Sequence, residues 1–179
     1  MTDLRLLTIS GSLRKGSYNR KLLAEAVHAF GPAEVIEADL NLPLYDGDLE
    51  DAKGIPESVQ TLVDQIKAAD AVVISSPEYN KGISGVLKNA LDWISRVPGS
   101  AFKNKPTVVM SANAGRTGGE TGQYMVIHCL VPHQAEMLPG PTLCVATAGD
   151  EFDENDRLLN ERYLKVLNTR MTALRDRVS

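Results

Sequence analysis

The chain has 179 residues, with 43% hydrophobic and 23% charged residues and a formal net charge of −4. This composition is typical of one globular domain, 1–179, and the lack of a basic block argues against nucleic acid as a partner. No apolar run approaches the ~20 residues of a membrane helix, no signal peptide is evident, and Cys129 and Cys144 form no disulfide framework, so we expect a cytoplasmic protein without membrane insertion.

Apolar strands alternate with amphipathic helices along the whole chain. The expected strands are Leu4–Ser10, Ala33–Ala38, Asp70–Ser76, Thr107–Ser111, Ala135–Leu138 and Leu143–Ala146. The expected helices are Tyr18–Ala29, one beginning near Pro56, Val86–Arg96, Glu120–Leu130 and Asp156–Arg177, with a turn-rich connection over residues 41–56. This alternation predicts a doubly wound α/β domain with a parallel sheet, whose ligand lies beyond the carboxyl ends of the strands.

The loop after the first strand, Gly11–Asn19, is the strongest site signal. It joins a buried strand to a helix and carries hydroxyl, amide and cationic groups: Ser10, Ser12, Arg14, Lys15, Ser17 and Asn19. Such a loop can bind a phosphate, because the first N–H groups of the helix point at the anion. The spacing is not that of a P-loop, since Ser17 stands where the lysine belongs. The alternative interpretation is a capped turn with a solvated basic tip.

Two further loops leave the same edge of the predicted sheet. In the loop over residues 77–85, Tyr79 and its polar neighbours could hold a flat heteroaromatic ring, or Asn80 and Ser84 could simply cap the next helix. The loop over residues 111–119 is rich in glycine and precedes a helix N-terminus, which would stabilise negative charge; simple loop flexibility is the alternative. Together with the first loop, they favour a nucleotide-like ligand.

With these motifs the chain resembles the NAD(P)H-dependent FMN reductase family, which includes quinone and chromate reductases. The resemblance rests on Gly11–Asn19, on Pro77–Asn80 and on Gly85–Trp93, and it extends from Leu4 to the last helix. It implies a flavodoxin-like three-layer sandwich with a five-stranded parallel sheet of order 2-1-3-4-5. It also implies non-covalent FMN as cofactor and NAD(P)H as co-substrate.

The resemblance further implies which residues touch the cofactor. The expected cofactor-binding residues are Ser10, Ser12, Leu13, Arg14, Ser17, Tyr18, Asn19, Pro77, Glu78, Tyr79, Asn80, Ser111, Asn113, Gly115 and Arg116. No protein acid or base is expected, because hydride transfer to flavin N5 is the cofactor's chemistry, and backbone N–H groups over residues 115–119 would favour the resulting charge. The implied reaction is a ping-pong transfer from NAD(P)H to quinones, flavins, azo dyes or chromate. The implied assembly is a homodimer or homotetramer.

Other functions fit the residues less well. A flavodoxin-type electron carrier would share the cofactor, but such carriers tend to be strongly acidic. A nucleotide-binding regulator or hydrolase without redox chemistry is the second alternative. A low-molecular-weight phosphatase is excluded, because neither cysteine begins a Cys-x₅-Arg loop. The three histidines show no metal-ligand spacing, and no motif distinguishes NADH from NADPH. Ser84, Arg116 and the stretch 129–134 depart from the family pattern.

Overall fold

A computed structural model gives the fold of the chain and describes residues 4–179. The strands are β1 (Arg5–Ser10), β2 (Glu34–Ala38), β3 (Ala71–Ser75), β4 (Glu78–Tyr79), β5 (Gly82–Ile83), β6 (Pro106–Ala112), β7 (Glu136–Met137) and β8 (Cys144–Val145). The helices are α1 (Tyr18–Phe30), α2 (Gly47–Lys53), α3 (Glu57–Ala68), α4 (Gly85–Arg96), α5 (Glu120–Leu130) and α6 (Glu161–Val178), with a short 3₁₀ turn at Ala148–Asp150.

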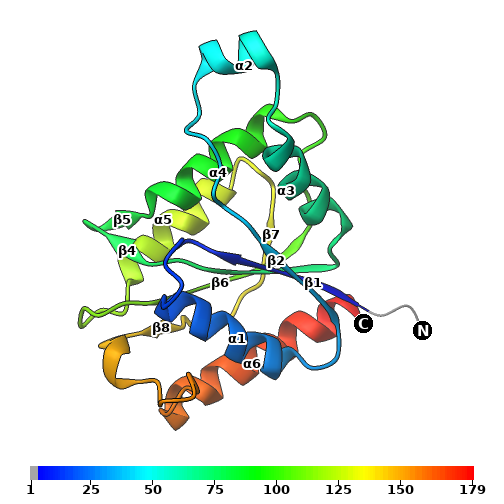
Figure 1. Cartoon of the computed structure of the whole chain (residues 1–179). Helices are drawn as coiled ribbons and strands as arrows, with labels where there is room; N and C mark the ends of the chain where they lie inside the picture. The colour runs from blue at the N-terminus through cyan, green and yellow to red at the C-terminus, as the bar shows by residue number, and fades with distance from the viewer. Residues whose placement is uncertain (1–3) are drawn as a thin grey trace.

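A parallel sheet of order β2-β1-β3-β6-β7 forms the middle layer, with β8 also paired to β6. Helices α3, α4 and α5 cover one face, and α1 and α6 cover the other (Figure 1). Both faces are therefore buried, which explains why β3 and β6 are fully buried apolar runs instead of alternating ones. The expected three-layer, flavodoxin-like architecture is confirmed.

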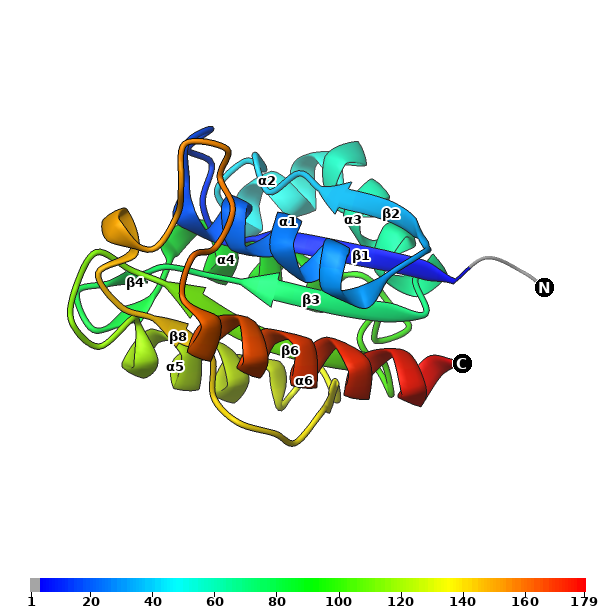
Figure 2. The same cartoon turned by 90° about the horizontal axis from the view of Figure 1, so that it is seen from below.

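The carboxyl ends of the strands lie opposite the end of the molecule that carries both termini (Figure 2). Helix α1 begins at this edge, where Ser17 is the N-cap and its hydroxyl accepts from the N–H of Asn19. It ends at Gly31, whose φ of 86° is a left-handed conformation that favours glycine. The loops after β1, β3 and β6 all leave from this edge, as expected.

The two short strands expected on either side of Pro139–Pro141 are confirmed as β7 and β8, which both pair with β6. The structure corrects three details of the expected elements. The connection expected to be turns contains helix α2, which buries none of its residues. The loop after β3 contains the β4–β5 hairpin. Helix α6 begins at Glu161 and not near Asp156, because Asp156 has a left-handed φ of 62° and Asn160 caps the helix.

Within the described residues, none of the helices is both long and apolar enough to cross a membrane.

Candidate functional site

Three loops at the carboxyl edge of the sheet meet around a cavity of about 130 Å³. It is lined by Ser12, Arg14, Ser17, Tyr18 and Asn19 from the loop after β1, by Pro77 and Tyr79 from the loop after β3, and by Ala112, Asn113 and Ala114 from the end of β6. Segments separated by about a hundred residues of sequence therefore converge on one polar hollow, at the place where ligands of doubly wound sheets bind.

Gly11 lets the first two loops approach each other. Its N–H donates to the carbonyl of Ser75 at 2.8 Å. A Cβ on Gly11 would lie 2.4 Å from Ser76 Oγ and 2.7 Å from Ser76 Cβ, distances that no side chain tolerates. Glycine is therefore needed here for close packing of one loop against the next.

Asn19, near the start of α1, is hydrogen-bonded to the ends of both β3 and β6. Its side chain is buried, with 2% exposure. Its amide donates to the carbonyl of Ala112 at 2.9 Å, and its Oδ1 accepts from the Ser75 hydroxyl at 2.8 Å and from the Ala112 N–H at 3.0 Å. Asn19 lines the cavity, but its hydrogen bonds hold the walls in place.

The cavity offers donors that suit a phosphate. Ser12 and Ser17 place hydroxyl groups on it, and Arg14 supplies a cation. The N-terminus of α1, capped by Ser17, adds partial positive charge. No Asp or Glu is among the ten lining residues, all of which lie in the described part of the chain. This donor set fits the phosphate of FMN, which is anionic and accepts several short hydrogen bonds.

The second and third loops are joined by a reciprocal pair of hydrogen bonds. The N–H of Glu78 donates to Asn113 Oδ1 at 3.0 Å, and Asn113 Nδ2 donates to the carbonyl of Glu78 at 3.0 Å. The Glu78 carboxylate accepts from the N–H of Gly122 at 2.9 Å and so caps the N-terminus of α5. The Gly122 N–H, with a smaller contribution from Lys81, lowers the pKa of Glu78 although burial opposes the shift. Glu78 thus links the β4–β5 hairpin to α5.

Replacing Glu78 with glutamine is expected to lower the free energy of unfolding by about 1.5–3 kcal/mol at neutral pH, as for a hydrogen bond to a charged group. Because the pKa of Glu78 is lower in the folded state, its contribution is present above the unfolded value of about 4.3. The contribution is lost as the pH falls through the folded pKa. Urea unfolding of both proteins from pH 7 to pH 3 should show their difference shrinking on the acid side. A constant difference would contradict this explanation.

Seven of the fifteen expected cofactor-binding residues do not line the cavity. The hydroxyl of Ser10 is bonded to the backbone of Ser12, and that of Ser111 donates to the carbonyl of Gly118 at 2.7 Å. Glu78 binds α5, and Asn80 lies at the tip of the hairpin with a φ of 51°. Leu13, Gly115 and Arg116 are exposed beside the cavity.

Sequence reasoning missed Ala112 and Ala114, which line the cavity without a polar side chain. Alanine carries no chemical signal, so only the position directly after a buried strand could have pointed to them. Among residues 4–179, no group of three or more His, Cys, Asp or Glu side chains is placed to hold a metal ion.

Comparison with known proteins identifies the family. The profile of the family described as NADPH-dependent FMN reductase matches residues 4–150. The chain is 41% identical over 174 residues to an NAD(P)H-dependent FMN reductase of Pseudomonas aeruginosa, covering 96% of this chain and 94% of the relative. It is 34% identical over 175 residues to a quinone reductase of Escherichia coli, covering 95% and 93%.

A solved structure agrees with the sequence comparisons. The flavoenzyme NAD(P)H:(acceptor) oxidoreductase from Paracoccus denitrificans superposes with a TM-score of 0.85 at 30% identity, covering 97% of this chain and 96% of that one. The chain therefore belongs to the NADPH-dependent FMN reductase family, which confirms the fold, the cofactor FMN and the NAD(P)H-dependent enzyme class expected from its motifs.

Proposed function

We propose that the chain reduces quinones and related small acceptors with NAD(P)H, using FMN held by the three loops. The observation that carries this proposal is the cavity that joins Arg14 and the hydroxyls of Ser12 and Ser17 to Tyr79 of the hairpin. FMN, when bound, supplies the redox chemistry, because its ring can take a hydride from NAD(P)H and pass two electrons to the acceptor. Membership of the NADPH-dependent FMN reductase family favours this proposal over an electron carrier without turnover.

The residues of this chain would bind and orient the cofactor. Arg14, Ser12 and Ser17 would hold the phosphate, with the α1 N-terminus adding partial charge. Pro77 and Tyr79 would lie against the ring, and Tyr79, with 53% exposure, offers an aromatic face at the open side. The Asn113–Glu78 pair would keep this hairpin at a fixed distance from the end of β6.

Steady-state kinetics test the proposal directly. If donor and acceptor use the same open side in turn, the mechanism is ping-pong and double-reciprocal plots with NADPH and a benzoquinone give parallel lines. Intersecting lines would contradict a shared site. A purified protein that carries FMN but does not oxidise NADPH in the presence of quinone would indicate the electron carrier instead.

We also propose that the chain self-associates through the outer face of α5. Thr121, Tyr124, His128 and Val131 follow one another at intervals of three and four residues, the spacing of a helix–helix seam. Two large side chains of this stripe, Tyr124 and Val131, are 55% and 66% exposed. This stripe has no partner in the described part of the chain.

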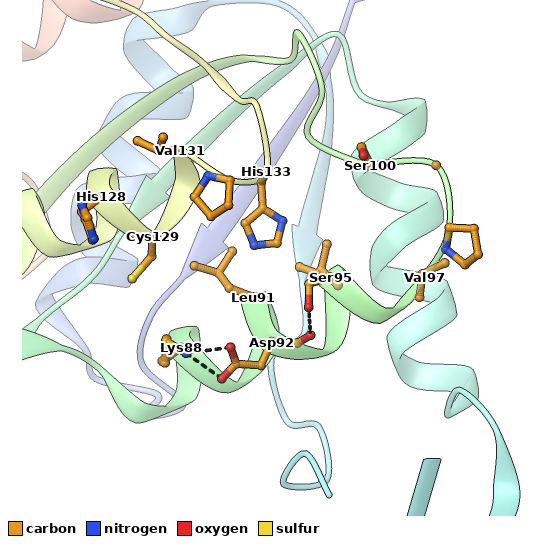
Figure 3. Close-up of a pocket in the computed structure, with 14 residues that line it drawn as sticks. Lys88, Leu91, Asp92, Ser95, Val97, Ser100, His128, Cys129, Val131 and His133 are labelled. Carbon is orange, nitrogen blue, oxygen red and sulfur yellow. Dashed lines mark hydrogen bonds and ion pairs between the residues drawn. The ribbon is translucent and has the colours of Figure 1, made fainter. Parts of the chain in front are cut away.

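A groove runs along this stripe. A cavity of about 790 Å³ lies between α4 and the chain at the end of α5, where Cys129 and His133 point toward α4 (Figure 3). Lys88, Leu91, Asp92, His128 and Val131 also line it. A second hollow of about 540 Å³ continues from His128 to Glu120. The geometry suits a second copy that brings its own α5 across a two-fold axis.

Such a dimer would place the partner near the cofactor. The Met125 sulfur lies 3.6 Å from the position of a Cβ on Gly82, so the hairpin that carries Tyr79 packs on the same helix. Sedimentation velocity should show a dimer for the wild type and a monomer for the double variant Tyr124→Asp/Val131→Asp. The control variant is Leu159→Asp, because Leu159 is as exposed as Tyr124 but lies outside this face; this variant should remain dimeric. A monomeric wild type at micromolar concentration would contradict the proposal.

A further inference from the structure

A second small cavity, of about 170 Å³, lies between α1 and the ends of β1 and β2. It is bounded by the last residues of β1 and β2 and by one face of α1, which packs over β1, β3 and β6. Its lining residues are Thr8, Ser10, Arg20, Leu23, Ala24, Val27, Glu37 and Ala38. None of these residues lines the cofactor cavity, so the two hollows are separate.

Arg20 is the unusual group in this cavity. Its Nε is buried and has no hydrogen-bond partner, and it is the sole buried side-chain nitrogen or oxygen in that state among residues 4–179. None of the seven ion pairs formed by the described residues includes Arg20. Buried polar groups in proteins are nearly always bonded, so an exception beside a cavity points to a bound water or ion.

The electrostatic setting of Arg20 favours an anion. Arg20 is the third residue of α1, at the positive end of the helix dipole, and the first turn of α1 contains no acidic residue. Thr8 donates its hydroxyl hydrogen to the carbonyl of Ile36 and Ser10 donates its own to that of Ser12, so neither hydroxyl adds a free donor to the cavity. The unsatisfied capacity of the cavity is therefore a cationic donor.

Glu37 is the opposing group. Its carboxylate lines the same cavity but is exposed and forms no ion pair with Arg20. An anion on Arg20 would thus be bound beside a carboxylate at the rim, which limits its affinity. Glu37 can therefore test the proposal. If Arg20 binds an anion, removing the charge of Glu37 should strengthen that binding.

We propose that Arg20 holds a phosphate group in this cavity, as a second phosphate subsite beyond the one for the flavin. The volume of about 170 Å³ suits one such group and excludes a whole nucleotide. The phosphate is either the free ion or the 2′-phosphate of the pyridine nucleotide. The guanidinium contributes the charge-assisted hydrogen bonds, and the α1 N-terminus adds to them.

Calorimetric titration of the FMN-saturated protein in chloride buffer tests this inference. The probes are inorganic phosphate and adenosine 2′,5′-bisphosphate, with adenosine 5′-monophosphate as the comparison that lacks the 2′-phosphate. Saturable binding of inorganic phosphate identifies a free-ion site. If inorganic phosphate does not bind and the bisphosphate binds at least tenfold tighter than the monophosphate, the site takes the 2′-phosphate of the nucleotide. Binding of none of the three probes overturns the proposal.

Three variants separate the site from general charge effects. Arg20→Gln should lower the affinity for the probe at least tenfold, and Glu37→Gln should raise that affinity severalfold. Arg162→Gln removes the same charge from an exposed position on α6 and should bind like the wild type. Equal binding by Arg20→Gln and wild type would overturn the proposal, as would weaker binding in Glu37→Gln.

A free-ion site does not depend on the proposed reductase function, whereas a 2′-phosphate site rests on it. Circular dichroism and FMN titration of each variant establish that the fold and the flavin site are intact, and Arg20→Lys retains the charge if the glutamine variant is unstable. A protein that fails to bind FMN would count against the proposed function. The difference between Arg20→Gln and wild type would still decide the second subsite, because the cofactor cavity is common to both proteins.

Discussion

Replacing Asn19 with alanine is expected to lower the free energy of unfolding by roughly 3–9 kcal/mol and to remove measurable FMN binding. The substitution deprives the buried Ser75 hydroxyl and both backbone groups of Ala112 of their partners. Each buried polar group left unsatisfied costs about 1–3 kcal/mol, which together gives this range. The loops after β1, β3 and β6 would then no longer be held around one cavity.

Urea unfolding and FMN titration measure the two effects of the Asn19 substitution. Asn168→Ala is the matched control, because Asn168 is an exposed residue on α6. It should change the free energy of unfolding by no more than about 0.5 kcal/mol, as is usual for exposed positions. A loss below 1 kcal/mol in the Asn19 variant, with FMN affinity retained, would show that these hydrogen bonds do not organise the site.

Replacing Gly11 with alanine is expected to have the next largest effect, with a loss of FMN affinity of about 100-fold. The added Cβ would lie 2.7 Å from Ser76 Cβ, so the first loop must move away from the second. Overpacking of this kind costs about 1–3 kcal/mol in stability. The displaced loop would carry Ser12 and Arg14 away from the cavity that they line.

The same loop provides the control for the Gly11 substitution. A Cβ on Gly16 meets no atom within 4 Å, so Gly16→Ala should leave both stability and FMN affinity close to the wild type. The two variants add the same methyl group five residues apart. If they lose FMN equally, the loop responds to any added side chain, and the close approach of Gly11 to Ser76 is not the cause.

The sheet order and most helices could be predicted from the sequence, because buried parallel strands are continuous apolar runs and α1, α3 and α4 carry clear apolar stripes. Helix α2 could not, since it has seven residues and buries none of them, so no apolar pattern marks it. The β4–β5 hairpin was missed because its turn is Asn80–Lys81 and lacks the usual Asn-Gly signal.

The candidate site was predicted in its location but only partly in the roles of its residues. Residue type showed that Asn19 and Glu78 could bind a ligand. It could not show that Asn19 bonds to β3 and β6, or that Glu78 caps α5. Those partners are 44 to 93 residues away in sequence, and only the folded chain brings them together. The cavity at the carboxyl edge followed from topology, whereas the division between binding and supporting residues did not.

Titration of FMN and of riboflavin into wild type and Arg14→Ala tests most directly whether the first loop holds the flavin phosphate. Riboflavin lacks the phosphate. The substitution should therefore weaken FMN binding by about 1.5–3 kcal/mol, as for a charge-assisted hydrogen bond, and leave riboflavin binding unchanged. An equal loss for both flavins, or no loss for FMN, would contradict a phosphate site at Arg14.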